Sequence, residues 1–191
     1  FISRNESAVI AFITGKDFLN QGFRIVSSHT DSPALKVKPD PIIKKNGYYL
    51  LNTEIYGGPI LNTWYDRELS LAGKIVLKDS NSFNLKEKLI DFKESIAVIP
   101  NLAIHLNKNV NKNGKIDKKK GLRAIITQKL DSDSSSNRGQ VLENSEDDIE
   151  AAEAGDLTLE KLIANFTDYK EEEILEAELY LYPAEEAAFL G

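Results

Sequence analysis

The chain contains no cysteine and no methionine among its 191 residues. Without cysteine it can form neither a disulfide scaffold nor a thiolate zinc site, and such a composition fits a reducing compartment. We therefore expect a cytoplasmic protein. Because the chain begins at Phe1 and has no methionine anywhere, we also expect a fragment or a processed form of a longer gene product.

Long apolar runs and an excess of basic residues are also missing. No window approaches the roughly 18 uninterrupted apolar residues of a membrane span, and no basic-then-apolar signal peptide opens the chain. The net charge of −6 argues against general nucleic-acid binding. We therefore expect neither a membrane nor a nucleic acid as partner. With 41% hydrophobic and 28% charged residues, the chain has the composition of an ordinary globular protein of one or two domains.

A histidine and an aspartate stand at the end of an apolar run. Phe23–Val26 predicts a short buried strand, and His29 and Asp31 follow it before Pro33 stops regular structure. In an open α/β sheet, ligands bind at the carboxyl ends of the strands. An imidazole there can bind a metal ion, and the carboxylate can orient the ring or touch the metal. The alternative is a strand-end histidine hydrogen-bonded to a loop aspartate, and His-x-Asp alone leaves both open.

Two further motifs follow in order along the chain. The sequence reads HTDSP at His29–Pro33, YGG at Tyr56–Gly58 before TWYDR at Thr63–Arg67, and PNLAIHLN at Pro100–Asn107. In order and spacing these motifs resemble the M18 aminopeptidases, the zinc exopeptidases that include aspartyl aminopeptidase and aminopeptidase I. The resemblance covers about residues 1–107 and returns at residues 178–191. A related M42-type zinc peptidase would lack the TWYDR pattern.

The resemblance implies an α/β fold class, with part of a zinc-exopeptidase catalytic sheet and an inserted β-rich dimerisation domain. The implied domains are residues 1–38 as the first part of the catalytic domain, 39–173 as the dimerisation domain, and 174–191 as an incomplete return to the catalytic domain. M18 enzymes are considerably longer than this chain, and their remaining metal ligands and catalytic glutamate lie beyond the position of Gly191. We therefore expect the chain by itself to be inactive.

The resemblance also implies roles for three residues. His29 corresponds to the first zinc ligand and Asp31 to the carboxylate that holds and polarises it, while the dimerisation domain carries His105 into the neighbouring subunit's active site. Two divalent ions are expected in each complete site, where zinc activates a water for peptide hydrolysis and a carboxylate takes its proton. The implied substrate is a peptide with an N-terminal, often acidic, residue to be removed.

The implied partner is a second copy of the chain, in a dimer that can assemble into a dodecamer. Two alternatives remain open. His105 lies between two apolar residues, Ile104 and Leu106, and on composition alone would be a structural histidine on a strand. The chain as a whole could be a non-catalytic, β-rich oligomerisation module.

The remaining pattern predicts mostly short strands. Asn46-Gly47 is a strong hairpin signal, and Leu159, Leu162, Ile163 and Phe166 form one face of a helix that opens at residues 156–160. The strands are expected at residues 2–5, 8–14 (covered on both faces), 42–45, 48–56, 71–78, 88–92, 96–99, 121–130 and 174–181, the last returning to the first sheet.

Several polar clusters have ordinary interpretations. Asp66-Arg67 is expected to be a structural ion pair or turn rather than a second metal or substrate site. Glu185-Glu186 is expected in a solvated loop or at a helix start. The Lys-rich segment 108–120 has an incomplete EF-hand pattern, and a solvated loop is favoured there over a calcium or phosphate site. The acidic, serine-rich residues 131–155 predict a mobile or partly ordered loop.

Overall fold

The computed structural model describes residues 1–4, 7–78, 84–108, 110–113, 115–128, 157–186 and 188–189. It divides into two units, residues 1–31 and residues 32–191, which are considered separately. The acidic segment 131–155, for which a loop was predicted, lies outside the described residues. Among the described helices, none has both the length and the apolar character needed to cross a membrane.

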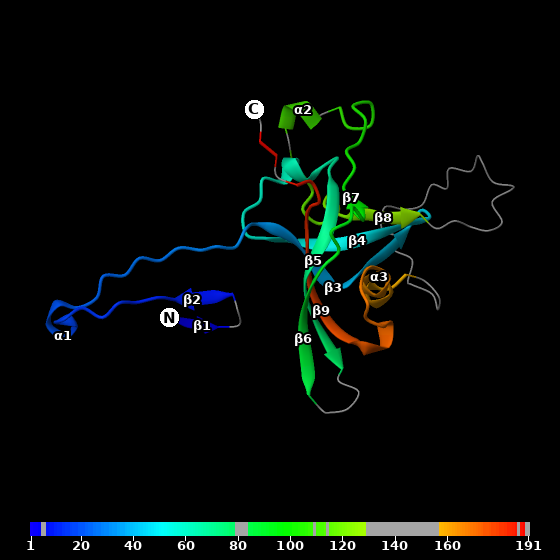
Figure 1. Cartoon of the computed structure of the whole chain (residues 1–191). Helices are drawn as coiled ribbons and strands as arrows, with labels where there is room; N and C mark the ends of the chain where they lie inside the picture. Colours follow the sequence, from blue (N-terminus) through cyan, green and yellow to red (C-terminus); the bar gives the residue numbers. More distant parts are fainter. Residues whose placement is uncertain are drawn as a thin grey trace, which may run out of the picture. The chain divides into compact units, whose positions relative to one another are not determined.

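Residues 32–191 form an antiparallel barrel (Figure 1). Its sheet has seven strands in the order β6-β5-β7-β8-β4-β3-β9, and β5 pairs with β9 as well. The ring therefore closes through β5, β7, β8, β4, β3 and β9, while β6 extends it beside β5. The strands are β3 (Ala34–Lys45), β4 (Tyr48–Tyr56), β5 (Glu68–Lys78), β6 (Leu85–Asp91), β7 (Ala97–Val98), β8 (Ala124–Gln128) and β9 (Ile174–Pro183).

The predicted hairpin joins β3 to β4. Lys45 pairs with Tyr48, and the two residues between them both have positive φ, 51° at Asn46 and 76° at Gly47. A two-residue turn with left-handed backbone at both positions matches the twist of the strands it joins. The hairpin prediction is confirmed.

Leucine and isoleucine side chains fill the barrel. Alternate residues of β5 point inward, so Leu69, Leu71 and Ile75 are fully buried. Leu35, Leu51, Leu179 and Leu181 from β3, β4 and β9 are buried equally well. This core belongs entirely to residues 32–191, which gives the barrel a hydrophobic interior of its own.

One helix, α3 (Leu159–Phe166), packs its apolar side on the barrel core. The Thr158 hydroxyl accepts a hydrogen bond from the backbone nitrogen of Lys161 at 3.1 Å and so caps the helix. Leu159, Leu162 and Ile163 are buried in the same cluster as the strand residues. The predicted helix and its buried face are confirmed. The short helices in this unit are η1 (Leu61–Trp64), α2 (Val110–Asn113) and η2 (Glu171–Glu173).

The last strand does not go where the sequence predicted. Residues 174–181 were expected to return to the first sheet, but β9 pairs with β3 and along its length with β5. That expectation was wrong, because the barrel cannot close without β9 between those two strands. The division into a catalytic and a dimerisation domain stays a prediction.

Residues 1–31 form a much smaller unit. Strands β1 (Ile2–Arg4) and β2 (Ala8–Ile10) pair antiparallel, and one helical turn, α1 (Phe18–Gln21), follows. Both predicted strands are present, the second ending at Ile10 instead of Thr14. The expected cover on both faces of the second strand is wrong. All the described residues of this unit are exposed, Ile13 to 98%. A two-stranded ribbon and one helical turn offer too little surface to bury these side chains.

The predicted buried strand at Phe23–Val26 is not formed either. The chain between α1 and β3 has no regular structure, and Phe23 and Val26 are 79% and 97% exposed. A strand needs a neighbour for its backbone hydrogen bonds, and the described residues of this unit provide none for this stretch. His29 therefore lies on an extended segment rather than at the end of a strand.

Candidate functional site

His29 and Asp31 contact each other through their side chains. The Nδ1 atom of His29 lies 2.9 Å from the Asp31 carboxylate oxygen Oδ1 and 3.0 Å from the Asp31 carbonyl oxygen. Both side chains are open to solvent, 83% exposed for His29 and 56% for Asp31. When Nδ1 carries the proton and donates a hydrogen bond to the carboxylate, the lone pair of Nε2 is left free for a metal ion. The geometry fits one metal ligand with its orienting carboxylate, and equally the simple hydrogen-bonded pair.

These two residues do not complete a metal centre. Within the described part of the chain there is no group of three or more His, Asp or Glu side chains that could hold an ion. A catalytic zinc usually needs three protein ligands and an open position. The described residues therefore supply a partial donor set of the right chemistry, one imidazole with a carboxylate behind it.

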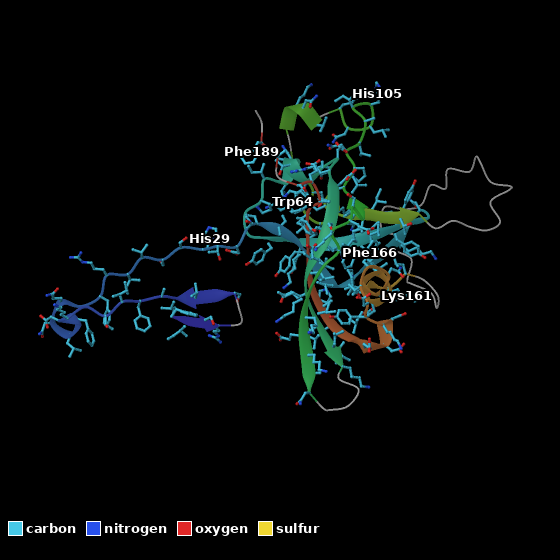
Figure 2. All side chains as sticks on the ribbon, viewed as in Figure 1. His29, Trp64, His105, Lys161, Phe166 and Phe189 are labelled. Atoms are coloured by element: carbon cyan, nitrogen blue, oxygen red, sulfur yellow. The ribbon has the colours of Figure 1, made fainter. Side chains whose placement is uncertain are left out.

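His105 lies at the tip of a turn on the loop that follows β7 (Figure 2). The backbone nitrogens of Leu106 and Asn107 both donate to the carbonyl of Ala103, at 2.8 and 3.1 Å. His105 is exposed, as are the apolar side chains of Leu102 (60%) and Leu106 (76%). The alternative that His105 is a structural histidine on a strand is therefore wrong.

Asp66 is a structural turn residue, as predicted. Its two carboxylate oxygens accept hydrogen bonds from Asn101, one from the backbone nitrogen and one from Nδ2, both at 2.8 Å. These bonds hold the pKa of the Asp66 carboxyl below its usual range. Arg67 pairs with Glu185 instead, at 2.9 Å. The Asp66–Asn101 contact has no local signal in the sequence, because its partners lie 35 positions apart.

The other polar clusters keep their ordinary interpretations. Glu185 is an exposed partner of Arg67 rather than half of a glutamate pair in an active site. One carboxylate oxygen of Asp117 accepts hydrogen bonds from the backbone nitrogens of Lys119 and Lys120, at 2.8 and 3.2 Å. These bonds within the loop lower the pKa of the Asp117 carboxyl. Asn109 and Gly114 of the incomplete EF-hand pattern lie outside the described residues.

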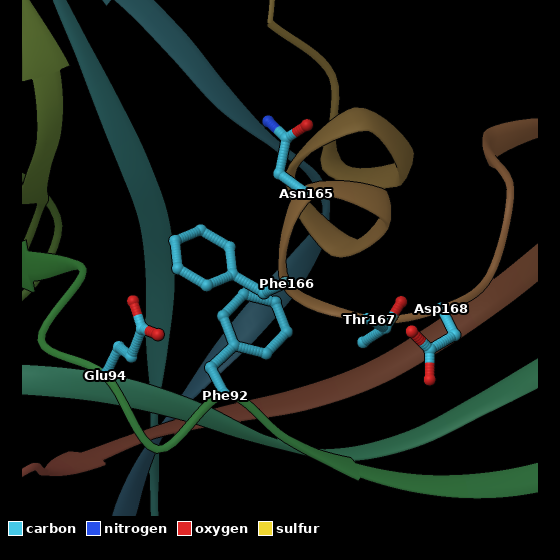
Figure 3. Close-up of a pocket in the computed structure, with 6 residues that line it drawn as sticks. All are labelled: Phe92, Glu94, Asn165, Phe166, Thr167 and Asp168. Carbon is cyan, nitrogen blue, oxygen red and sulfur yellow. The ribbon is translucent and has the colours of Figure 1, made fainter.

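A separate hollow of about 350 Å³ lies beside α3 (Figure 3). The rings of Phe92 and Phe166 stack at its wall, with centroids 4.8 Å apart. Its other lining residues are Glu94, Asn165, Thr167 and Asp168. None of the candidate site residues His29, Asp31 and His105 lines it. Its stacked rings join α3 to the segment that follows β6.

Comparison with known proteins gives consistent matches. A sequence model of the family described as aminopeptidase I zinc metalloprotease (M18) matches residues 1–191. A probable M18 family aminopeptidase 2 of Ectopseudomonas mendocina (strain ymp) is 38% identical over 192 aligned residues, covering 100% of this chain and 40% of its own length. The chain thus spans less than half of that relative.

Solved structures share the fold. The cryo-EM structure of the Ape4 and Nbr1 complex matches with a TM-score of 0.67 and 28% identity over 86% of this chain and 30% of that one. A structure described as the S. cerevesiae mApe1 dodecamer matches with a TM-score of 0.53 and 20% identity over 83% of this chain and 30% of that one. At that identity the second match shows the fold alone.

Proposed function

Because the chain belongs to the M18 family of aminopeptidase I zinc metalloproteases, we propose that it is part of a zinc-dependent aminopeptidase that removes N-terminal residues from peptides. The observation that carries this proposal is the family match over residues 1–191. A preference for acidic N-terminal residues is proposed from the family resemblance alone. The absence of cysteine supports a reducing compartment such as the cytoplasm.

In this proposal His29 ligates zinc through Nε2 while Asp31 holds the ring from behind. The chemistry that a bound zinc would supply is an acidified water, with a pKa of about 7, and a polarised scissile carbonyl. The carboxylate of Asp31 fixes which ring nitrogen carries the proton and makes the other a better donor to the metal. The remaining donors of a two-ion site and the general base lie outside the described residues, in keeping with the absence of a third donor among those residues.

The barrel is proposed to pair two subunits, with His105 of each reaching the active site of the other. Support comes from the exposed position of His105 on a turn, from the exposed leucines on either side of it, and from the dodecameric assembly of a protein with this fold. A two-fold interface brings the same patch of both subunits together. There the His105 imidazole would donate a hydrogen bond to the substrate carbonyl oxygen as that oxygen gains charge.

A second candidate function is a non-catalytic assembly module. The observation that favours it is that the barrel has its own closed core, while the described residues supply only part of a metal site. An aminopeptidase assay on the purified chain with added zinc tests whether the missing metal ligands lie within the chain. We expect no turnover from the chain alone, whereas turnover abolished by a chelator would show that the missing ligands lie within it.

The test of the proposed function is His29→Ala in the assembled enzyme that carries this chain. We expect loss of bound metal and of nearly all peptidase activity, while Asp31→Asn should cost about 10- to 100-fold. Lys16→Ala, an exposed change in the same unit, is the control and should alter neither quantity. Unchanged metal content and turnover in His29→Ala would rule out the role of His29.

A further inference from the structure

We propose that Tyr65 and Asp66 are positioning residues for His105, because between them they hold both ends of the loop that carries it. This inference rests on the proposed function of His105. The His105 loop is defined here as residues 100–121, which leave β7 and lead towards β8. Tyr65 and Asp66 lie in the turn between η1 and β5, on a different part of the barrel sequence.

Asp66 holds the first end of the His105 loop. Its backbone nitrogen donates to the carbonyl of Ile99 at 2.9 Å, and its carboxylate accepts both hydrogen bonds from Asn101. Asn101, four positions before His105, is thus hydrogen-bonded to Asp66 through both its main chain and its side chain. Hydrogen bonds to a charged acceptor are stronger than those between neutral groups.

Tyr65 holds the second end. Its hydroxyl donates to the carbonyl oxygen of Gly121 at 2.7 Å, and the Gly121 nitrogen donates to the carbonyl of Asp117 at 2.8 Å. A Cβ atom placed on Gly121 would lie 3.1 Å from the Tyr65 hydroxyl oxygen and 2.8 Å from the Asp117 carbonyl oxygen. The Asp117 carbonyl thus leaves no room for a Cβ at position 121, and the Tyr65 hydroxyl lies close beside the same backbone.

The backbone between these two anchors determines where the imidazole lies. In the described part of the chain no hydrogen bond or ion pair is made by the His105 side chain itself, and its turn is closed only by the two bonds to Ala103. Fixing Asn101 therefore limits the positions that the turn and His105 can take. A misplacement of about 1 Å in a reacting group can cost on the order of 100-fold in rate, so loosening the first anchor should lower kcat.

The variant Asp66→Asn in the assembled enzyme tests this directly. It replaces one acceptor oxygen by an NH₂ group that faces the Nδ2 donor of Asn101. We expect kcat to fall by about 10- to 100-fold with little change in KM. Adding Asn101→Asp gives the new NH₂ group a carboxylate oxygen to which it can donate a hydrogen bond. Most of the lost kcat should then be regained. Arg67→Gln, which breaks only the neighbouring exposed pair with Glu185, should leave kcat unchanged.

A double-mutant cycle separates positioning from general stability. In a His105→Ala background, Asp66→Asn should cause no further loss of kcat, whereas a purely structural role would cause the same loss in both backgrounds. If His105→Ala leaves kcat unchanged, the proposed function of His105 fails. If His105→Ala lowers kcat and Asp66→Asn does not, only the present inference is overturned. Should Asp66→Asn not fold, Tyr65→Phe takes its place in the same cycle, because it removes the second anchor without a change of charge. A loss of kcat that disappears in the His105→Ala background supports positioning, and no loss of kcat, or an equal loss in both backgrounds, overturns it.

Discussion

Two apolar segments of this chain have similar composition and very different surroundings. Residues 8–14 read AVIAFIT and residues 69–77 read LSLAGKIVL. In β5 the side chains of Leu69, Leu71 and Ile75 are fully buried, because they point into the core of the barrel that β5 closes with its neighbours. In the first segment only Ala8–Ile10 form a strand, with one neighbour, and Val9 and Phe12 are 66% and 62% exposed. Apolar composition predicts the capacity to form a strand, but a core that faces the side chains decides burial.

Truncating one large side chain in each segment should sharpen this contrast most. Leu71→Ala should lower the free energy of unfolding by about 2–5 kcal/mol, because it opens a cavity in a closed barrel. Phe12→Ala in the same chain should change it by less than about 0.5 kcal/mol, as an exposed side chain does. Urea unfolding of the 191-residue chain, followed by circular dichroism, measures both. Equal effects would contradict the distinction between the two units.

A pair of glycines gives the next largest contrast. At Gly73 in β5, φ is 156° and an added Cβ would lie 2.1 Å from the carbonyl oxygen of Glu178 on β9, whereas at Gly15 nothing lies within 4 Å. Gly73→Ala should therefore force the β5–β9 seam apart and cost about 3 kcal/mol. Gly15→Ala should be neutral or slightly stabilising. A stable Gly73→Ala barrel with unchanged unfolding midpoint would show that this seam does not need to be so close.

The smallest effect concerns an exposed ion pair on the barrel. Lys36 Nζ lies 2.6 Å from Glu178 Oε1, and this bond, followed by that from the Tyr180 hydroxyl, lowers the pKa of the Glu178 carboxyl. A carboxyl with a lowered pKa in the folded state contributes stability above its unfolded pKa and loses it as pH falls through the folded pKa. Because the pair is exposed, the contribution at neutral pH should be at most about 1 kcal/mol.

Replacing Glu178 by glutamine tests that sign. The difference in unfolding free energy between Glu178→Gln and the unchanged chain should be present at pH 7 and disappear in acid. Glu176→Gln, an exposed change on the same strand, serves as the control for loss of a surface charge. A difference that grows as the pH falls would mean that the pair does not stabilise the charged carboxylate.

Local signals in the sequence predicted the local parts of the fold. Asn46-Gly47 was enough to place the β3–β4 hairpin, and the apolar face of residues 159–166 was enough to place α3. The pairing of β9 with β5 joins residues about a hundred positions apart and has no local signal. A strand's partner depends on which other strands leave an edge free, so barrel closure could not be predicted from patterns within each segment.

The candidate site shows the same division. The His29–Asp31 contact joins residues two positions apart and could be expected from the motif, whereas the Asp66–Asn101 contact joins residues 35 apart and could not. The alternation of Leu102, Ile104 and Leu106 is typical of a strand, which favoured the wrong alternative for His105. The structure has a turn there, because Ala103 accepts hydrogen bonds from within the loop instead of from a neighbouring strand.

In the proposed enzyme, one active site takes His29 from one subunit and His105 from the other. Mixing His29→Ala subunits with His105→Ala subunits, each nearly inactive alone, tests this arrangement. A mixed dimer then holds one site with both lesions and one site with neither, since the two-fold axis exchanges the contributed residues. We expect recovery towards about half of the unmodified activity per mixed dimer. No recovery, with mixed dimers shown to form by mass spectrometry, would place His105 in its own subunit's site or in none.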